Sequence, residues 1–119
     1  MKDHSKKIKR LLREHMTEAY ERELYRELTK LDKHFAEWRN GKISSGELSH
    51  RIHQYENGLA RDLFKQYNHG EDDMNVAYAI VSGILDREQV PAELLEALAP
   101  QLSFYQNLKD RNELREPGT

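Results

Sequence analysis

Apolar side chains recur every three or four positions through residues 5–40, and this stretch contains neither glycine nor proline. The pattern predicts one helix from Ser5 to Asn40, which at 1.5 Å per residue is about 54 Å long. Its apolar positions form two successive groups on faces rotated by about 120°. The first group is Ile8, Leu11, Leu12, Met16 and Ala19, and the second is Tyr20, Leu24, Leu28, Leu31, Phe35 and Trp38. Each face needs its own packing partner.

Two arrangements satisfy both groups. A break near Met16 would turn both toward one core, whereas a straight helix would offer the first group to another molecule. Sharp kinks usually coincide with a proline, a glycine or a bulge, and no proline or glycine is present. We therefore expect a straight helix that binds a second copy of the chain or another protein. The side chains of that interface are Ile8, Leu11, Leu12, Met16 and Ala19.

Two further helices are marked by their start signals. Ser44 and Glu47 have capping-box spacing before an apolar stripe, which predicts a helix from about Ser45 to Asn68. Its stripe is Leu48, Ile52, Tyr55, Leu59, Leu63 and Tyr67. Acidic residues 71–73 precede a helix over about Asp73 to Asp86, whose apolar side chains cover more than half its circumference. Such a helix must be surrounded, so we expect it at the centre of the fold.

The last helix begins after Pro91, because proline suits a first helical position. Its apolar stripe from Leu94 to Leu108 continues through Pro100 without losing phase, which predicts a helix kinked there. A break with a restart at Pro100 is the alternative. Glycine inside a helix costs up to about 1 kcal/mol relative to alanine, so we expect Gly58 and Gly83 to permit close packing of neighbouring backbones.

Together these elements predict an all-α protein. The expected fold is a four-helix bundle with a long projecting N-terminal helix and a Pro-kinked C-terminal helix. Residues 1–112 would form a single helical domain, and residues 113–119 a disordered C-terminal tail with little to bury. A chain of 119 residues is long enough for one core, and a second independent core is not expected.

The composition narrows the range of functions. The chain has no cysteine, which excludes disulfides, thiol nucleophiles and thiolate metal sites. No apolar run approaches the length of a membrane span, and none follows the basic N-terminus as it would in a signal peptide. We therefore expect a cytoplasmic protein.

Charge is unevenly distributed along the chain, although its net value is only −2. Residues 1–13 carry six Lys and Arg against one Asp, and residues 70–119 carry four against ten acidic residues. The basic side chains at the start of the first predicted helix are Lys6, Lys7, Lys9, Arg10 and Arg13. They either attract the acidic half of the chain, within one fold or across a dimer, or bind nucleic acid.

Five side chains of the 45–68 helix fall within about 80° of one another, away from its apolar stripe. They are His50, His53, Asn57, Arg61 and Phe64. A phenylalanine among hydrogen-bonding groups indicates a binding patch, whereas the alternatives are an ordinary polar face or a catalytic site with His53 as general base. His50 and His53 are also suited to bind zinc or nickel together with a ligand from outside the helix. A carboxylate-bridged di-iron bundle needs two Glu-x-x-His motifs, and the sequence has one. We predict no cofactor and no metal.

Motifs that specify a reaction are missing from the sequence. It has no phosphate-binding glycine loop, no Gly-x-Ser-x-Gly elbow and no His-Glu-x-x-His helix. We therefore expect a small non-enzymatic interaction or adaptor protein that acts as a homodimer. One alternative is a nucleic-acid-binding or regulatory protein that uses the basic N-terminal helix. The other is a metal-binding protein that uses the His50/His53 pair.

Overall fold

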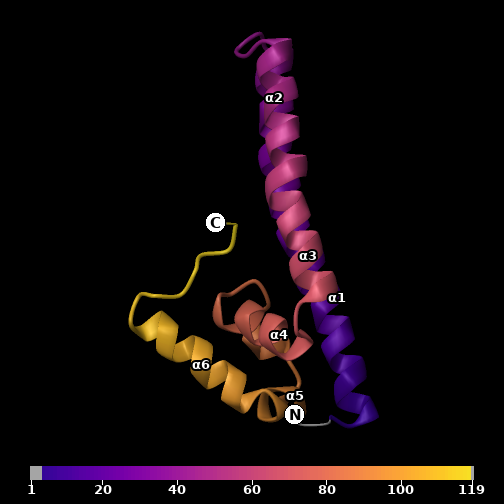
Figure 1. Cartoon of the computed structure of the whole chain (residues 1–119), viewed down its shortest axis with the longest axis vertical. Helices are drawn as coiled ribbons and strands as arrows, with labels where there is room; N and C mark the ends of the chain where they lie inside the picture. The colour runs from indigo at the N-terminus through magenta and orange to yellow at the C-terminus, as the bar shows by residue number, and fades with distance from the viewer. Residues whose placement is uncertain (1–3, 119) are drawn as a thin grey trace.

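The computed structural model describes residues 4–118. Every regular element in this range is helical, and none of its helices is long and apolar enough to cross a membrane. The first helix, α1 (Lys6–Arg39), has no break. The Ser5 hydroxyl caps its start by accepting a hydrogen bond from the Ile8 amide, and beyond its end Gly41 takes a left-handed conformation. The predicted long, unbroken N-terminal helix is therefore confirmed (Figure 1).

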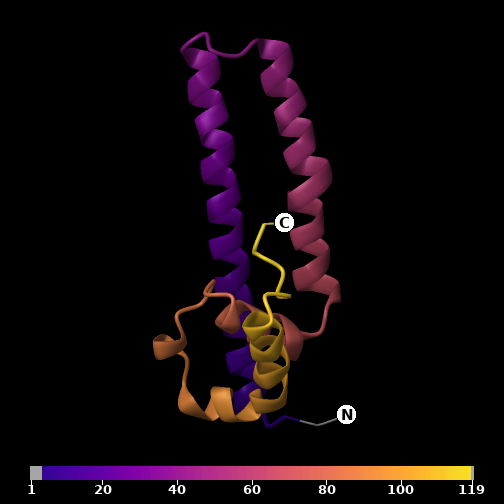
Figure 2. The same ribbon diagram turned by 90° about the vertical axis from the view of Figure 1, so that its left-hand side faces the viewer.

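A second arm runs back beside α1 (Figure 2). It consists of α2 (Ser45–Tyr55), the π-helical turn η1 (Glu56–Ala60) and α3 (Arg61–His69), which follow one another without interruption. The Ser44 hydroxyl accepts a hydrogen bond from the Glu47 amide (3.0 Å), as the capping-box spacing predicts. The arm covers the predicted 45–68 helix and forms a long hairpin with α1.

The π-helical turn follows from the spacing of the apolar stripe. From Tyr55 the stripe advances by four residues at a time, through Leu59 and Leu63 to Tyr67. On an ideal α-helix each such step drifts by about 40°, so the three steps would rotate Tyr67 by about 120° away from Tyr55. A π turn contains more residues than an α turn and removes much of this drift. Leu63 and Tyr67 are accordingly buried on the side of the arm that faces α1 and the head.

The remaining elements form a head around the first half of α1 (Figure 1). They are α4 (Asp72–Val81), the 3₁₀ turn η2 (Arg87–Gln89), α5 (Ala92–Ala97) and α6 (Ala99–Asp110). α4 packs against α1 on one side and α6 on another, and every residue from 76 to 81 is buried. The expectation of a central, surrounded third helix is therefore confirmed, although the helix is shorter than predicted.

The first apolar group of α1 lies inside this head. Leu11, Leu12, Met16 and Ala19 are 0–9% exposed and belong to the main core, with Ile8 packed partly against it. Their face is covered by α4 and α5 of the same chain. This corrects the assignment of these side chains to a partner interface, because periodicity identifies an apolar face but not the segment that covers it. A straight helix and a core within one chain are therefore compatible.

The predicted four-helix bundle with a Pro-kinked last helix is not confirmed. The last stripe is divided into α5 and α6 by Leu98, whose backbone (φ −100°, ψ 10°) leaves the helical region. Pro100 lies in the first turn of α6, where its missing amide hydrogen is tolerated. The head surrounds only the first half of α1, and the far half of the hairpin rises beyond it (Figure 2). The fold is thus a hairpin with a head at one end.

α4 ends earlier than its apolar pattern predicts because of Gly83. This residue has a φ of 86°, and it follows the C-cap Ser82, whose amide bonds to the Tyr78 carbonyl. A Cβ atom added at Gly83 or at Gly58 would meet nothing within 4 Å. The expectation that these two glycines permit close packing is therefore wrong. Gly83 serves the backbone conformation, and Ile84 and Leu85 are buried outside the helix.

The sequence analysis predicted a disordered tail from residue 113 onward. In the structure, residues 113–118 return along the head toward the hairpin. Leu114 packs against the core, and the Tyr78 hydroxyl donates a hydrogen bond to the Arg115 carbonyl (2.6 Å). The Arg115 guanidinium lies 4.7 Å from the centre of the Tyr78 ring, a cation–π distance. The segment reaches α1 at Gly118, which is close to the side chain of Glu27. Thr119 lies outside the described residues.

Replacing Gly83 by alanine tests the end of α4. A left-handed conformation costs a residue with a Cβ atom about 1–2 kcal/mol, so Gly83→Ala should lower the free energy of unfolding by that amount. Gly58→Ala is the matched control, because Gly58 is helical and has open space for the methyl group. Urea denaturation of both variants measures the difference. Equal stability of the two variants would contradict the assigned role of Gly83.

Candidate binding groove of the hairpin

A groove follows the far half of the hairpin, between α1 and the opposing arm. Its volume is about 500 Å³. The residues that line it are Glu27, Lys30, Leu31, His34, Arg51, Gln54, Tyr55 and Leu59. Leu31, Tyr55 and Leu59 supply half-buried apolar surface, while the other side chains are polar or charged. The C-terminal segment lies on the same side of the hairpin as α4 and α6 (Figure 1), and in Figure 2 it is seen in front of the two arms.

Two buried carboxylates lie at the head end of this groove. Glu23 is 2% exposed and Glu27 is 5% exposed. The Tyr67 hydroxyl donates a short hydrogen bond to Glu23 (2.5 Å), and the Lys30 ammonium lies 3.1 Å from Glu27. Arg26 is 3.8 Å from Glu23 and 3.6 Å from Glu27. An unpaired buried carboxylate would cost several kcal/mol. Arg26 and Lys30 are partners within α1, whereas Tyr67 comes from the second arm, so its hydrogen bond to Glu23 holds the two arms in one register.

The sequence analysis missed both carboxylates. Glu23 and Glu27 are one helical turn apart on α1. On a helical wheel Glu23 lies at about 140°, inside the arc of about 20–160° that the first apolar group spans, and Glu27 lies at about 180°, between that arc and the second apolar group. Acidic residues one turn apart inside an apolar arc are a readable signal for buried charge. The tyrosines opposite them, Tyr67 on α3 and Tyr55 on α2, were identified only as members of an apolar stripe.

The tyrosines around this cluster have perturbed pKa values. Burial raises the pKa of Tyr67 far above its ordinary value, and its hydrogen bond to Glu23 raises it further. Burial also raises the pKa of Tyr55, Tyr78 and Tyr105. The phenol of Tyr67 is thus held in its neutral, proton-donating form, which suits a structural donor and not a general base.

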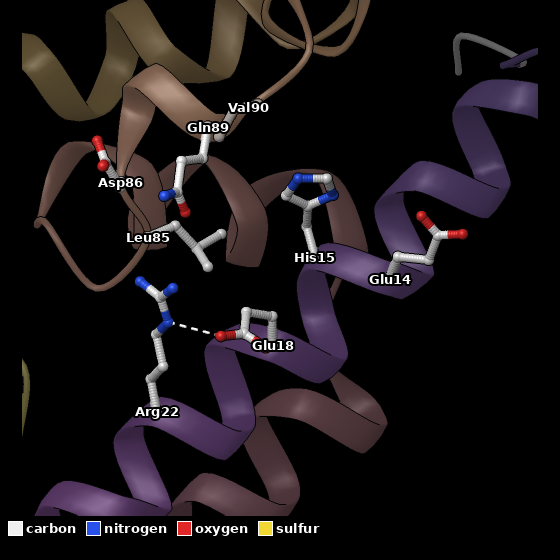
Figure 3. A pocket seen from close by; sticks show the side chains of 8 residues that line it. All are labelled: Glu14, His15, Glu18, Arg22, Leu85, Asp86, Gln89 and Val90. Atoms are coloured by element: carbon white, nitrogen blue, oxygen red, sulfur yellow. Dashed lines mark hydrogen bonds and ion pairs between the residues drawn. The ribbon is translucent and has the colours of Figure 1, made fainter.

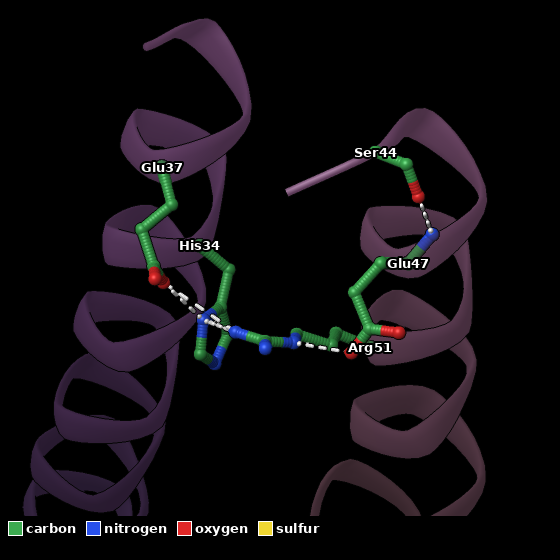
Figure 4. A network of polar contacts seen from close by, with 5 residues as sticks. All are labelled: His34, Glu37, Ser44, Glu47 and Arg51. Carbon is green, nitrogen blue, oxygen red and sulfur yellow. Dashed lines mark hydrogen bonds and ion pairs between the residues drawn. The ribbon is translucent and has the colours of Figure 1, made fainter. Parts of the chain in front are cut away.

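A polar network crosses the far end of the groove (Figure 4). Arg51 donates from Nε to Glu47 (3.0 Å) and from Nη1 to Glu37 (3.4 Å), so it joins the two arms. His34 Nδ1 lies 2.6 Å from Arg51 Nη1 and 2.9 Å from Glu37. Nδ1 of His34 can accept a hydrogen bond from Arg51 or donate one to Glu37, but it cannot do both at once. The tautomer of His34 therefore selects between these bonds. The hydrogen bond from His34 is the largest influence that lowers the pKa of Glu37, and the charge of Arg51 also lowers it.

The predicted binding patch lies on a different surface. His50, His53, Asn57, Arg61 and Phe64 are all exposed, and none of them lines the groove. Arg61 donates to Asn57 (3.4 Å), and the Phe64 ring, which is 52% exposed, contacts His69 edge-on. Among residues 4–118 there is no group of three or more side chains arranged to hold a metal ion. Binding at this patch stays a prediction.

The basic side chains at the start of α1 are exposed. They are Lys6, Lys7, Lys9, Arg10 and Arg13. Lys7 forms an ion pair with Glu93 of α5 (2.8 Å), and Arg10 lies 3.6 Å from Glu14. His4 likewise contacts Asp73 at the start of α4 (2.7 Å). The contacts of Lys7 and His4 thus join the basic N-terminal segment to acidic residues in the second half of the same chain. Nucleic-acid binding stays a prediction.

A smaller pocket of about 210 Å³ lies where α1 meets the segment after α4 (Figure 3). It is lined by Glu14, His15, Glu18, Arg22, Leu85, Asp86, Gln89 and Val90. His15 Nδ1 donates to the Leu11 carbonyl (2.7 Å). Arg22 bonds to Glu18 (2.7 Å) and to the Ile84 carbonyl (3.0 Å). The bond from Arg22 to the Ile84 carbonyl ties the segment to α1. The lining contains no hydroxyl or thiol nucleophile.

Comparisons with protein-family models, with curated proteins and with solved structures found no match to this chain.

Removing the Tyr67 hydroxyl tests the pairing of Glu23. Tyr67→Phe leaves a buried carboxylate without its short hydrogen bond, so the free energy of unfolding should fall by about 1–3 kcal/mol. Tyr25→Phe is the control, because Tyr25 is 70% exposed and loses only a solvated hydroxyl. Urea denaturation at neutral pH measures both variants. A similar effect of the two substitutions would show that the hydroxyl contributes nothing to stability.

Alkaline pH tests the raised pKa values. Above about pH 10 tyrosines ionise in the unfolded chain while Tyr67 stays protonated in the fold, so stability should fall as the pH rises. Each such tyrosine contributes a slope of up to about 1.4 kcal/mol per pH unit. Tyr67→Phe should therefore show a shallower loss between pH 10 and 11 than the wild type in urea denaturation. Identical slopes would contradict the buried, neutral phenol.

Proposed function

We propose that this chain is a small non-enzymatic interaction protein that forms a homodimer through the groove in the far half of the hairpin. The observation that carries the proposal is the groove itself. It is about 500 Å³ in volume and is lined in part by apolar side chains from both arms, Leu31 from α1 and Tyr55 and Leu59 from the second arm. The arms rise beyond the head (Figure 2). A second hairpin laid on this groove would complete four antiparallel helices, an arrangement in which each helix buries its apolar stripe against two neighbours.

The head and the C-terminal segment restrict how two copies meet. The head lies at one end of the hairpin, and the C-terminal segment lies on the same side of the hairpin as the head (Figure 1). The segment reaches the groove lining at Glu27 and Lys30. Two parallel copies would bring their heads into collision. Two antiparallel copies overlap only along their far halves, with the heads at opposite ends, and a twofold axis passes between them. The same groove residues then serve both copies, as in the isologous interfaces of most homodimers.

Charges along the groove favour this antiparallel arrangement. At the head end the exposed charged side chains are those of Arg26 and Lys30, which are 42% and 56% exposed. At the far end Glu37 and Glu47 are 38% and 45% exposed. The antiparallel overlap places Arg26 and Lys30 of each copy near Glu37 and Glu47 of the other, where they would add to the pairs that the first two form with Glu23 and Glu27 and the last two with Arg51. Such rim charges contribute mainly to orientation and specificity.

Sedimentation velocity over a concentration series tests the homodimer. The wild type should shift from 14.1 kDa toward twice that mass as its concentration rises. Gln54→Arg places a bulky charge on an exposed position of the groove and should weaken the dimer by about tenfold or more, as expected for a charge left unpaired in an interface.

His53→Arg is the matched control. His53 is the neighbouring residue, is equally exposed and lies outside the groove lining. It receives the same charge, so its dimer should match that of the wild type. A monomer at every concentration would overturn the proposal. So would a dimer that His53→Arg disrupts and Gln54→Arg leaves intact.

A further inference from the structure

We infer that Asn40, in the turn between α1 and α2, is a site of spontaneous deamidation, whereas the fold protects Asn57, the first residue of the second Asn-Gly pair. The group modified is the side-chain amide of asparagine, and the other reactant is water. The inference is independent of the proposed homodimer, because Asn40 and Gly41 lie outside the lining of the groove.

The two sites share the same pair of residues. Asn-Gly occurs at residues 40–41 and again at residues 57–58, and both asparagines are exposed. A glycine after asparagine favours deamidation in either place, because the attacking backbone nitrogen has no adjacent side chain to hinder it and the backbone rotates freely. The dipeptide alone therefore does not distinguish the two sites. A difference between them in the folded chain must come from the surrounding backbone.

The reaction closes a ring within the backbone. The amide nitrogen of Gly41 loses its proton and forms a bond to Cγ of Asn40, while the bond from Cγ to Nδ2 breaks and ammonia leaves with a proton. Water then adds to one carbonyl of the cyclic imide and reopens it. Cleavage of the bond from the nitrogen to Cγ yields aspartate. Cleavage of the bond from the nitrogen to the main-chain carbonyl carbon yields isoaspartate, in which the chain runs through the former side chain.

The turn between the arms permits this attack at low cost (Figure 2). Asn40 is the C-cap of α1 with a ψ of 6°, and this torsion must rotate to bring the Gly41 nitrogen onto Cγ. The rotation breaks the hydrogen bond from the Gly41 amide to the Trp38 carbonyl (3.1 Å). It also disturbs the bond from the Lys42 amide to the Glu37 carbonyl (2.8 Å). A Cβ atom at Gly41 would meet nothing within 4 Å, and exposed turns with so few contacts open readily.

Asn57 is held within the second arm. It lies in the π-helical turn η1, which continues α2 and leads directly into α3. Its Oδ1 accepts a hydrogen bond from Arg61 (3.4 Å). The same backbone rotation at Asn57 would interrupt the helical arm and displace Leu63, which is buried one and a half turns further on. Opening therefore costs much more free energy here than in the turn, and the imide forms only in the open state.

Deamidation of Asn40 should loosen the end of the hairpin. The product adds a negative charge at the C-terminus of α1, where the helix dipole disfavours one. Isoaspartate also lengthens the backbone by one carbon atom, which moves the Gly41 amide away from its acceptor. Trp38 reports on this change, because it is the only tryptophan in the chain and its Nε1 donates to Ser45 of α2 across the turn (3.0 Å).

Incubation of the folded, full-length chain at mildly alkaline pH tests the inference. Peptide mass spectrometry measures the conversion of amide to acid at each site. We expect Asn40 to convert about tenfold or more faster than Asn57, since the rate follows the population of the open form. The same incubation in concentrated urea is the reference, because both sites are then open and their rates should be similar. The emission of Trp38 in the folded chain should move to longer wavelength as Asn40 converts.

Asn40→Gln and Asn57→Gln are the matched controls. Each keeps an amide, but the longer side chain disfavours the five-membered ring. Asn40→Gln should abolish both the conversion and the emission shift, whereas Asn57→Gln should leave both as in the wild type. Equal conversion of Asn40 and Asn57 in the folded chain, or the same ratio of rates with and without urea, would overturn the inference. Conversion of Asn40 with unchanged Trp38 emission would contradict the loosening of the turn.

Discussion

The length of α1 is the constraint on which the rest of this structure depends. The helix has 34 residues, and the molecule is 53 Å long in its largest dimension. A head built from residues 72–110 is too short to surround such a rod, so it covers the first half only. The second half has one main neighbour, the returning arm. A pair of helices leaves apolar surface on both sides of its contact, and the groove is the consequence.

Buried charge sets the position of the arm against this rod. Apolar contacts between two long helices tolerate sliding, because one aliphatic side chain replaces another at similar cost. Glu23, which bonds to Tyr67, and Arg51, which joins Glu37 and Glu47, each require one alignment of the arms. The π turn lies between these two positions and keeps the apolar stripe in phase with both. Register is therefore fixed at each end of the groove.

Much of this fold could be predicted from local signals, because they act over one or two turns. The stretch without glycine or proline between Ser5 and Asn40 and the capping box at Ser44 predicted the two helices that form the hairpin arms. Coverage of a face by a distant segment carries no such local signal, which is why Leu12 and Met16 were assigned to a second copy and not to α4. The groove was missed for the same reason, since its lining comes from two arms and includes Glu27, which the sequence analysis did not single out.

The central claim is that two hairpins meet antiparallel along their far halves. The absence of cysteine allows a single spin label to be placed at Lys33→Cys, near the middle of the overlap, or at Lys42→Cys, at the hairpin tip. Electron–electron double resonance then measures the distance between the two labels of a dimer. The account predicts a short distance for position 33 and a clearly longer one for position 42. Equal distances at both positions, or no dipolar signal from either, would contradict it.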